Sequence, residues 1–156
     1  MKKDLVSYSS SIGKMELHIS FKVKYCHEIF VDEKIKECCS KAFLEASTRC
    51  KTEIKEMGFD KDHTHMEIMI NPNFSIAKIV KQLKGYSARV LMREFPELKK
   101  KYFWGGHLWS PAYYFDSVGD KNSETMKNYV RNQGNARNQG KKELEKKQMR
   151  IFECLS

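Results

Sequence analysis

Residues 15–24, Met-Glu-Leu-His-Ile-Ser-Phe-Lys-Val-Lys, alternate apolar and polar side chains without interruption. Successive side chains of a β-strand point to opposite faces of the sheet, so a period of two residues is typical of a strand with one buried face. The apolar set is Met15, Leu17, Ile19, Phe21 and Val23. The polar set is Glu16, His18, Ser20, Lys22 and Lys24. This stretch therefore predicts a strand with one face in the core and the other polar.

Two segments downstream carry apolar residues at the three- and four-residue spacing of a helix. The first follows Asp32, which can cap a helix, and extends to about Arg49. The second follows Ser75, another possible cap, and ends before Pro96. Gly85 lies inside this second helix and costs about 1 kcal/mol relative to alanine, a cost that helices tolerate.

Shorter strands are predicted between and after these helices. Residues 52–57 and 63–70 form a pair, and residues 58–62 between them contain the Gly and Asp that suit a hairpin turn. Residues 102–118 are rich in aromatic residues and glycine and predict a further strand with irregular flanks. A last helix is predicted from about 123 to 133, with Gly134 as its stop signal.

The order strand, helix, hairpin, helix, strand, helix predicts an α+β fold. It is the order of a ferredoxin-like split βαβ sandwich with an antiparallel sheet, extended here by an added C-terminal helix. Two helices are expected to cover one sheet face, and the helix that contains Tyr129 is expected on or near the other face. We predict one domain over residues 1–156, with its core at about 14–135 and a helical tail at about 141–156.

Composition narrows the classes of partner. The chain has 29 Lys and Arg against 20 Asp and Glu, a net charge of +9, which favours a polyanion such as nucleic acid. Its apolar runs are far shorter than the roughly 18 residues that span a bilayer, and its N-terminus lacks a signal peptide, so we expect a cytoplasmic protein with no membrane partner. Five cysteines without CxxC spacing predict packing roles and not a disulfide framework or a thiolate zinc site.

The segment His63-Thr64-His65 places two histidines two residues apart on a predicted strand. Both imidazoles then project from one face, where a single metal ion can accept both. Residues 64, 66, 68 and 70 alternate inward, so Glu67 joins the histidines on the polar face. Two histidines that are simply polar residues on a solvent-exposed strand face, with no role in metal binding, give the same pattern.

A second short pattern is Tyr129-Val130-Arg131-Asn132-Gln133. Tyr129 and Gln133 are one helical turn apart and share a face, so a phenol and an amide oxygen converge there. Taken alone, this spacing is equally typical of an exposed pair on an amphipathic helix.

Together these segments resemble the single-tyrosine HUH transposases of small bacterial and archaeal insertion sequences, in which HUH stands for histidine, hydrophobic residue, histidine. The resemblance spans about residues 14–135. It rests on DHTHMEIMI, IVKQLKGYSARVLMREFPELKK, FWGGHLWSPAYYFDSVG and YVRNQ, which begin at residues 62, 79, 103 and 129. Thr64 departs from the family, which usually has an apolar residue there, and we expect this to change only packing.

The resemblance implies a mechanism. His63, His65 and Gln133 would hold a divalent ion, Mg²⁺ or Mn²⁺, at the scissile phosphate. Tyr129 would attack phosphorus and form a 5′-phosphotyrosine with a free 3′-hydroxyl, and attack by another 3′-hydroxyl would join new ends without ATP. The sequence contains no GxxxxGK[ST] phosphate loop, in keeping with the absence of a nucleotide cofactor. It does not identify the base for Tyr129, and Glu67 is only a facing carboxylate.

The resemblance also implies partners. These are single-stranded DNA with a hairpin near each element end, and a second copy of the chain. In the homodimer, His63 and His65 of one subunit would meet Tyr129 and Gln133 of the other. Candidate phosphate contacts are Lys78, Lys81, Lys84, Arg89 and residues 99–101, although each is equally compatible with a solvated charge. Trp104, Trp109, Tyr113 and Tyr114 are candidates either for base stacking or for core and dimer contacts.

Two other functions keep part of this pattern. A non-catalytic ferredoxin-like module would bind single strands through strand aromatics, as RRM proteins do, but residues 16–22 carry none on their polar side and no RNP1 motif is present. An HUH nuclease for replication initiation or repeat processing would keep the same site and change only the DNA substrate.

Overall fold

The computed structural model describes residues 5–103 and 105–118, so Tyr129, Gln133, the last predicted helix and the tail lie outside the described residues. Its elements are, in order, β1 (Val6–Ser7), β2 (Ile12–Gly13), β3 (Glu16–Val23), η1 (Lys24–Cys26), η2 (Ile29–Val31), α1 (Glu33–Arg49), β4 (Glu53–Phe59), β5 (His63–Met69), α2 (Ile76–Glu94), α3 (Pro96–Lys101) and β6 (Trp109–Ser117).

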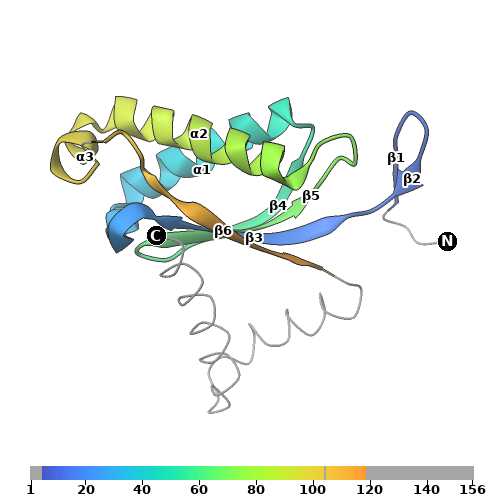
Figure 1. Cartoon of the computed structure of the whole chain (residues 1–156), viewed down its shortest axis with the longest axis horizontal. Helices are drawn as coiled ribbons and strands as arrows, with labels where there is room; N and C mark the ends of the chain where they lie inside the picture. Colours follow the sequence, from blue (N-terminus) through green and yellow to red (C-terminus); the bar gives the residue numbers. More distant parts are fainter. Residues whose placement is uncertain (1–4, 104, 119–156) are drawn as a thin grey trace, which may run out of the picture.

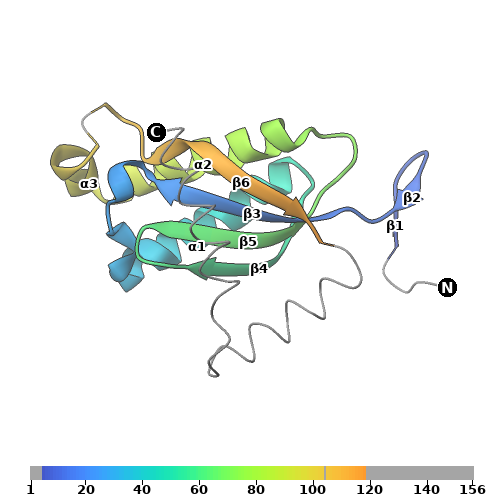
Figure 2. The same ribbon diagram turned by 60° about the horizontal axis from the view of Figure 1, so that its bottom comes forward.

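The main sheet has the strand order β4-β5-β3-β6, and every neighbouring pair is antiparallel. Each βαβ unit is split, because β5 lies between β3 and β4, and β3 lies between β5 and β6. Figure 2 shows β6 and β4 at the two edges of the sheet. This arrangement confirms the predicted ferredoxin-like α+β fold.

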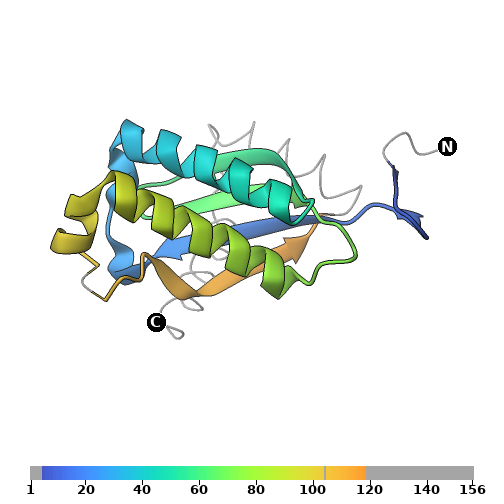
Figure 3. The same ribbon diagram turned by 90° about the horizontal axis from the view of Figure 1, so that it is seen from above.

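Helices α1 and α2 lie side by side across one face of the sheet (Figures 1 and 3). Both predicted caps are present, because Asp32 Oδ1 accepts from the Lys34 N–H at 2.8 Å and Ser75 Oγ accepts from the Lys78 N–H at 3.1 Å. Pro96 follows α2 as predicted but also begins the short helix α3, which the sequence analysis missed. Proline suits the first helical position, because an N–H at that position makes no hydrogen bond within the helix and proline therefore loses none.

The core lies between the sheet and the two helices. It contains the predicted inward residues Leu17, Ile19, Phe21 and Val23, whereas Met15 precedes the strand and is exposed. Trp109 joins them, since its ring centroid lies 5.8 Å from those of Phe21, Phe30 and Phe43. Its indole N–H donates to Ser87 Oγ at 2.9 Å. Trp109 is therefore a core residue, the second of the two roles left open for it.

The turn between β4 and β5 is shorter than predicted. Strand β4 continues through Gly58 to Phe59, and the Asp60 N–H donates to the His63 carbonyl at 2.8 Å to close the turn. Glycine usually punctuates a strand, which is why residues 58–62 were all assigned to the loop. The prediction was wrong for Gly58, which lies opposite His65 in the sheet.

The sheet face opposite α1 and α2 carries His18, His63 and His65, and we call it the histidine face. Two of its polar residues, Glu16 and Lys22, are buried, unlike the exposed positions that alternation predicted. Glu16 forms ion pairs with Lys14 at 3.3 Å and with Lys55. Burial raises the pKa of Glu16, but the hydrogen bonds and charges of the two lysines outweigh it and lower the pKa.

A few features were not predicted at all. The hairpin of β1 and β2 projects beyond the end of the main sheet (Figure 1). The two 3₁₀ turns η1 and η2 follow β3, and Tyr25 and Cys26 have positive φ angles there. Cys39 and Cys50 are buried as expected for packing residues, whereas Cys26 is exposed. Within residues 5–103 and 105–118, no helix is long and apolar enough to cross a membrane.

Candidate functional site

Strand β5 separates its side chains as the sequence predicts. Thr64, Met66 and Ile68 are at most 1% exposed and face the helices. His63, His65 and Glu67 lie on the histidine face, and the His63 and His65 ring centroids are 6.4 Å apart. The two imidazoles thus lie near each other on one face, as a shared ion would require.

Two aspartates of the β4–β5 turn hold His63. Asp62 Oδ1 lies 2.9 Å from Nδ1, and Asp60 Oδ2 lies 2.9 Å from Nε2. A carboxylate on one ring nitrogen orients metal-binding histidines, and Asp62 is placed for this role. An ion at Nε2 of His63 would also be within reach of the Asp60 carboxylate. Sequence reasoning assigned both aspartates only to the turn, although their position directly before the histidines was a usable signal.

This donor set fits a divalent ion in part. Imidazole nitrogens and carboxylate oxygens suit first-row divalent ions. Among the described residues, however, no group of three or more His, Cys, Asp or Glu side chains is arranged to hold an ion. The amide oxygen of Gln133, the third ligand that the sequence resemblance implies, lies outside the described residues.

Thr64 does more than change the packing. Its side chain is fully buried, and Oγ1 donates to the Gly58 carbonyl at 3.0 Å, from β5 to β4. The expectation of a packing difference alone was therefore wrong, because the hydroxyl has found a backbone acceptor that an apolar side chain could not bond.

Glu67 is opposite His18 of β3 and Glu56 of β4. On the same face, Tyr114 is opposite Ser20 and half-buried, whereas Tyr113 is opposite the core residue Phe21. Of the described aromatic candidates, Tyr114 is therefore the one placed near the histidines. Trp104 lies outside the described residues.

The candidate phosphate contacts on α2 differ among themselves. Lys78, Lys81 and Arg89 are exposed. Lys84 instead donates through Nζ to the carbonyls of β6 residues 110, 111 and 112. Burial lowers the pKa of Lys84 to about 8. The contacts of Lys84 thus join α2 to the edge strand, and its part in DNA binding stays a prediction.

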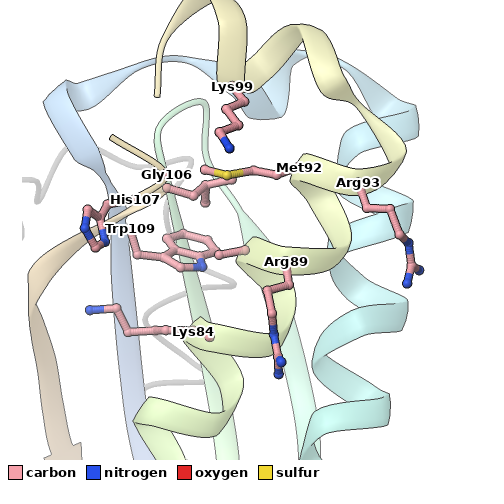
Figure 4. A pocket seen from close by; sticks show the side chains of 11 residues that line it. Lys84, Arg89, Met92, Arg93, Lys99, Gly106, His107 and Trp109 are labelled. Atoms are coloured by element: carbon pink, nitrogen blue, oxygen red, sulfur yellow. The ribbon is translucent and has the colours of Figure 1, made fainter. Parts of the chain in front are cut away.

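A groove of about 660 Å³ lies between α2, α3 and the segment that leads into β6 (Figure 4). Trp109 and Met92 form its apolar floor, and Lys84, Arg89, Lys99 and His107 surround it. None of the described residues that line it is an Asp or Glu. The groove on the other side of α2, of about 280 Å³, contains Lys34, Lys41 and Arg93 together with three glutamates. Arg93 lines both grooves, but among the described residues the first groove has the larger excess of positive charge, and it lies on the helix-covered side of the sheet.

Known proteins resemble this chain over most of its length. The family described as Transposase IS200 like matches residues 11–133. The ISDra2 transposase TnpA of Deinococcus radiodurans is 31% identical over 122 residues, which are 78% of this chain and 86% of that protein. The transposase for insertion sequence element IS200 of Salmonella typhimurium is 32% identical over 116 residues, 74% of each chain.

Solved structures agree with the sequence relatives. A transposase from Deinococcus radiodurans R1 superposes with a TM-score of 0.67 and 30% identity, and the match covers 82% of this chain and 97% of that one. A REP-associated tyrosine transposase, solved with a bound REP hairpin, superposes with a TM-score of 0.53 at 10% identity, over 78% of this chain and 67% of that one. The second likeness concerns the fold alone.

Proposed function

The chain belongs to the IS200-like transposase family, and from this premise we propose that it cuts and rejoins single-stranded DNA at the ends of an insertion sequence through Tyr129. The observation that supports this best is the pair His63 and His65, which project from one strand onto one face with ring centroids 6.4 Å apart. We also propose that residues 1–156 form a single HUH transposase domain.

His63, His65 and Gln133 would bind Mg²⁺ or Mn²⁺, which when bound would polarise the scissile phosphate and offset its growing charge. Asp62 orients His63 through Nδ1. The Tyr129 oxygen attacks phosphorus in line, a bond to the 5′-phosphate forms, and the bond to the 3′-oxygen of the other fragment breaks. A phenol has a pKa of about 10, so Tyr129 must first lose its proton, and Glu67 is a carboxylate on the same sheet face as the two histidines.

The direct test is covalent trapping. Purified protein is incubated with a single-stranded element end and Mg²⁺ or Mn²⁺, and we expect a protein–DNA adduct that survives denaturing electrophoresis. Binding with no adduct under either ion would favour the non-catalytic single-strand module. Adducts formed only on DNA unrelated to element ends would favour the HUH nuclease of replication or repeat processing.

The proposed DNA contacts divide between the two sides of the sheet. The cleaved strand lies on the histidine face, whereas the basic groove beside α2 holds another part of the DNA. The REP-associated tyrosine transposase of the same fold is bound to a REP hairpin, and a hairpin near the element end is the occupant that we propose for this groove. The described lining of the groove carries an excess of positive charge, and a DNA backbone in the groove would relieve the repulsion between those cations.

We predict that the double variant Arg89→Gln, Lys99→Gln binds the element end more weakly and with less salt dependence. Each lost phosphate contact should reduce the slope of log K against log salt by about 0.7 for a single strand and about 0.9 for a duplex. Fluorescence anisotropy at several salt concentrations measures this slope. The cleavage rate at saturating DNA should stay unchanged, because the groove is remote from the histidines.

The matched control is the double variant Lys34→Gln, Lys41→Gln, which removes the same charge from the neighbouring mixed groove. Its binding curve should follow that of the unmodified protein. Equal losses in both variants would mean that only net charge matters and would remove the groove from the proposal.

We further propose a homodimer in which His63 and His65 of one subunit act with Tyr129 and Gln133 of the other. A heterodimer of a His63→Ala subunit and a Tyr129→Phe subunit then keeps one intact site and loses the other. We predict that such heterodimers form a covalent adduct on the His63→Ala chain, while each mutant homodimer forms none. Differently tagged subunits, purified together, allow the labelled chain to be identified by mass. Verified heterodimers with no adduct on either chain would exclude sharing in trans.

A further inference from the structure

Gly58 is an unexpected residue beside His65 on the histidine face. It lies within β4, and glycine weakens strands because it has no side chain to pack. Its backbone does not explain the choice, since Gly106 is the described glycine with a positive φ angle. In the register of β4 and β5, Gly58 is directly opposite His65.

The imidazole of His65 fills the space above Gly58. A Cβ atom added at Gly58 would lie 2.7 Å from Cε1 and 3.1 Å from Cδ2 of His65, and nearer still to Nε2. Side-chain carbons do not come so close to other atoms in real proteins. Gly13, the other glycine of a described strand, has nothing within 4 Å of the same position. The missing side chain at Gly58 therefore creates a recess that one particular ring occupies.

Thr64 fixes this recess from the other side of the sheet. Its buried hydroxyl donates to the Gly58 carbonyl at 3.0 Å. The strand at Gly58 is thus held between a hydroxyl on the helix side and an imidazole on the histidine side. Because the backbone is bonded in place, a larger residue at position 58 must displace the ring and not the strand.

We propose that Gly58 is a positioning residue: its recess holds the His65 imidazole where His63 and His65 can bind one divalent ion together. This inference rests on the proposed metal-binding role of the two histidines. It assigns a function in the ion site to a β4 residue that carries no ligand atom of its own. Residues that orient a metal ligand commonly change metal affinity by about 10- to 100-fold when they are replaced.

Gly58→Ala tests the inference. All three nearest atoms belong to the ring of one exposed side chain, which can rotate outward, so the variant is expected to fold. Its Mn²⁺ affinity, measured on the full chain without DNA by calorimetry or by the paramagnetic resonance signal of free Mn²⁺, should fall about tenfold or more. Gly13→Ala is the matched control and should bind Mn²⁺ as the unmodified chain does. Thermal unfolding of all variants shows whether the loss exceeds any general destabilisation.

A double variant separates ring displacement from other effects. In the His65→Ala background the ring is gone, so adding Gly58→Ala should cause no further loss of Mn²⁺ affinity. A folded Gly58→Ala protein with unchanged Mn²⁺ affinity would overturn the inference. The inference would also be overturned if adding Gly58→Ala to His65→Ala lowered the Mn²⁺ affinity as much as Gly58→Ala does alone.

A measurement on the unmodified chain covers the case in which Gly58→Ala does not fold. The nuclear Overhauser effect between the Gly58 Hα atoms and the His65 ring protons should persist at saturating Mg²⁺, and its loss would overturn the inference. Because neither ion binding nor this signal requires DNA, a chain that binds Mn²⁺ but forms no adduct would refute the proposed function and leave the role of Gly58 standing.

Discussion

Tyr129→Phe should abolish cleavage and covalent adduct formation, with a loss of at least about 10³-fold, because the substitution removes only the attacking oxygen. Binding of the single-stranded element end should remain, since the aromatic ring and the basic surface are kept. The measurement is adduct formation with labelled DNA, alongside anisotropy to confirm binding. Tyr129 lies outside the described residues, so this result would identify the nucleophile by its reactivity.

Residual adduct in Tyr129→Phe would assign the nucleophile to another tyrosine. Tyr113, Tyr114 and Tyr86 are the next candidates in the sequence, and the structure separates them. Tyr114 is on the histidine face opposite Ser20, whereas Tyr113 is opposite Phe21 on the helix-covered face. The Tyr86 hydroxyl donates to Glu45 of α1, away from the histidines. Tyr114→Phe would therefore be the next variant to combine with Tyr129→Phe.

His63→Ala and His65→Ala are each expected to stop cleavage at ordinary ion concentrations, because each removes one ligand and weakens ion binding. Excess Mn²⁺ should restore part of the activity, since the remaining ligands still bind weakly. The measurement is adduct yield over a titration with Mn²⁺. Normal cleavage by either variant without added ion would show that the ligand assignment is wrong.

His18→Ala provides the matched control for these two variants. His18 lies on the same face of the sheet, opposite Glu67 of β5 and Asp116 of β6, but is not a proposed ligand. Its cleavage should stay close to that of the unmodified protein at every ion concentration. A loss equal to that of His63→Ala would indicate a general sensitivity of the histidine face and not a specific ion site.

Local sequence patterns were sufficient to predict much of the fold of this molecule. Alternation in residues 15–24 and around His63 assigned the inward and outward residues of β3 and β5, because side-chain direction along a strand depends on position alone. Asp32 and Ser75 marked the starts of α1 and α2 through hydrogen bonds made within the next three residues. The order of these elements then predicted the ferredoxin-like sheet. The four motifs that begin at residues 62, 79, 103 and 129 together predicted the family.

The surroundings of the site were decided by contacts between segments distant in sequence. Which residue lies opposite His65 depends on the register of β4 and β5, and a turn two residues shorter than predicted placed Gly58 there. Packing of α2 against β6 directed the Trp109 indole into the core and the Lys84 ammonium toward strand carbonyls, and no local pattern indicated either contact. The sequence by itself determined which residues share a face, because that is a local property of the chain. Only the tertiary structure decided which of them meet, because strand register and helix docking bring together positions that no local pattern relates.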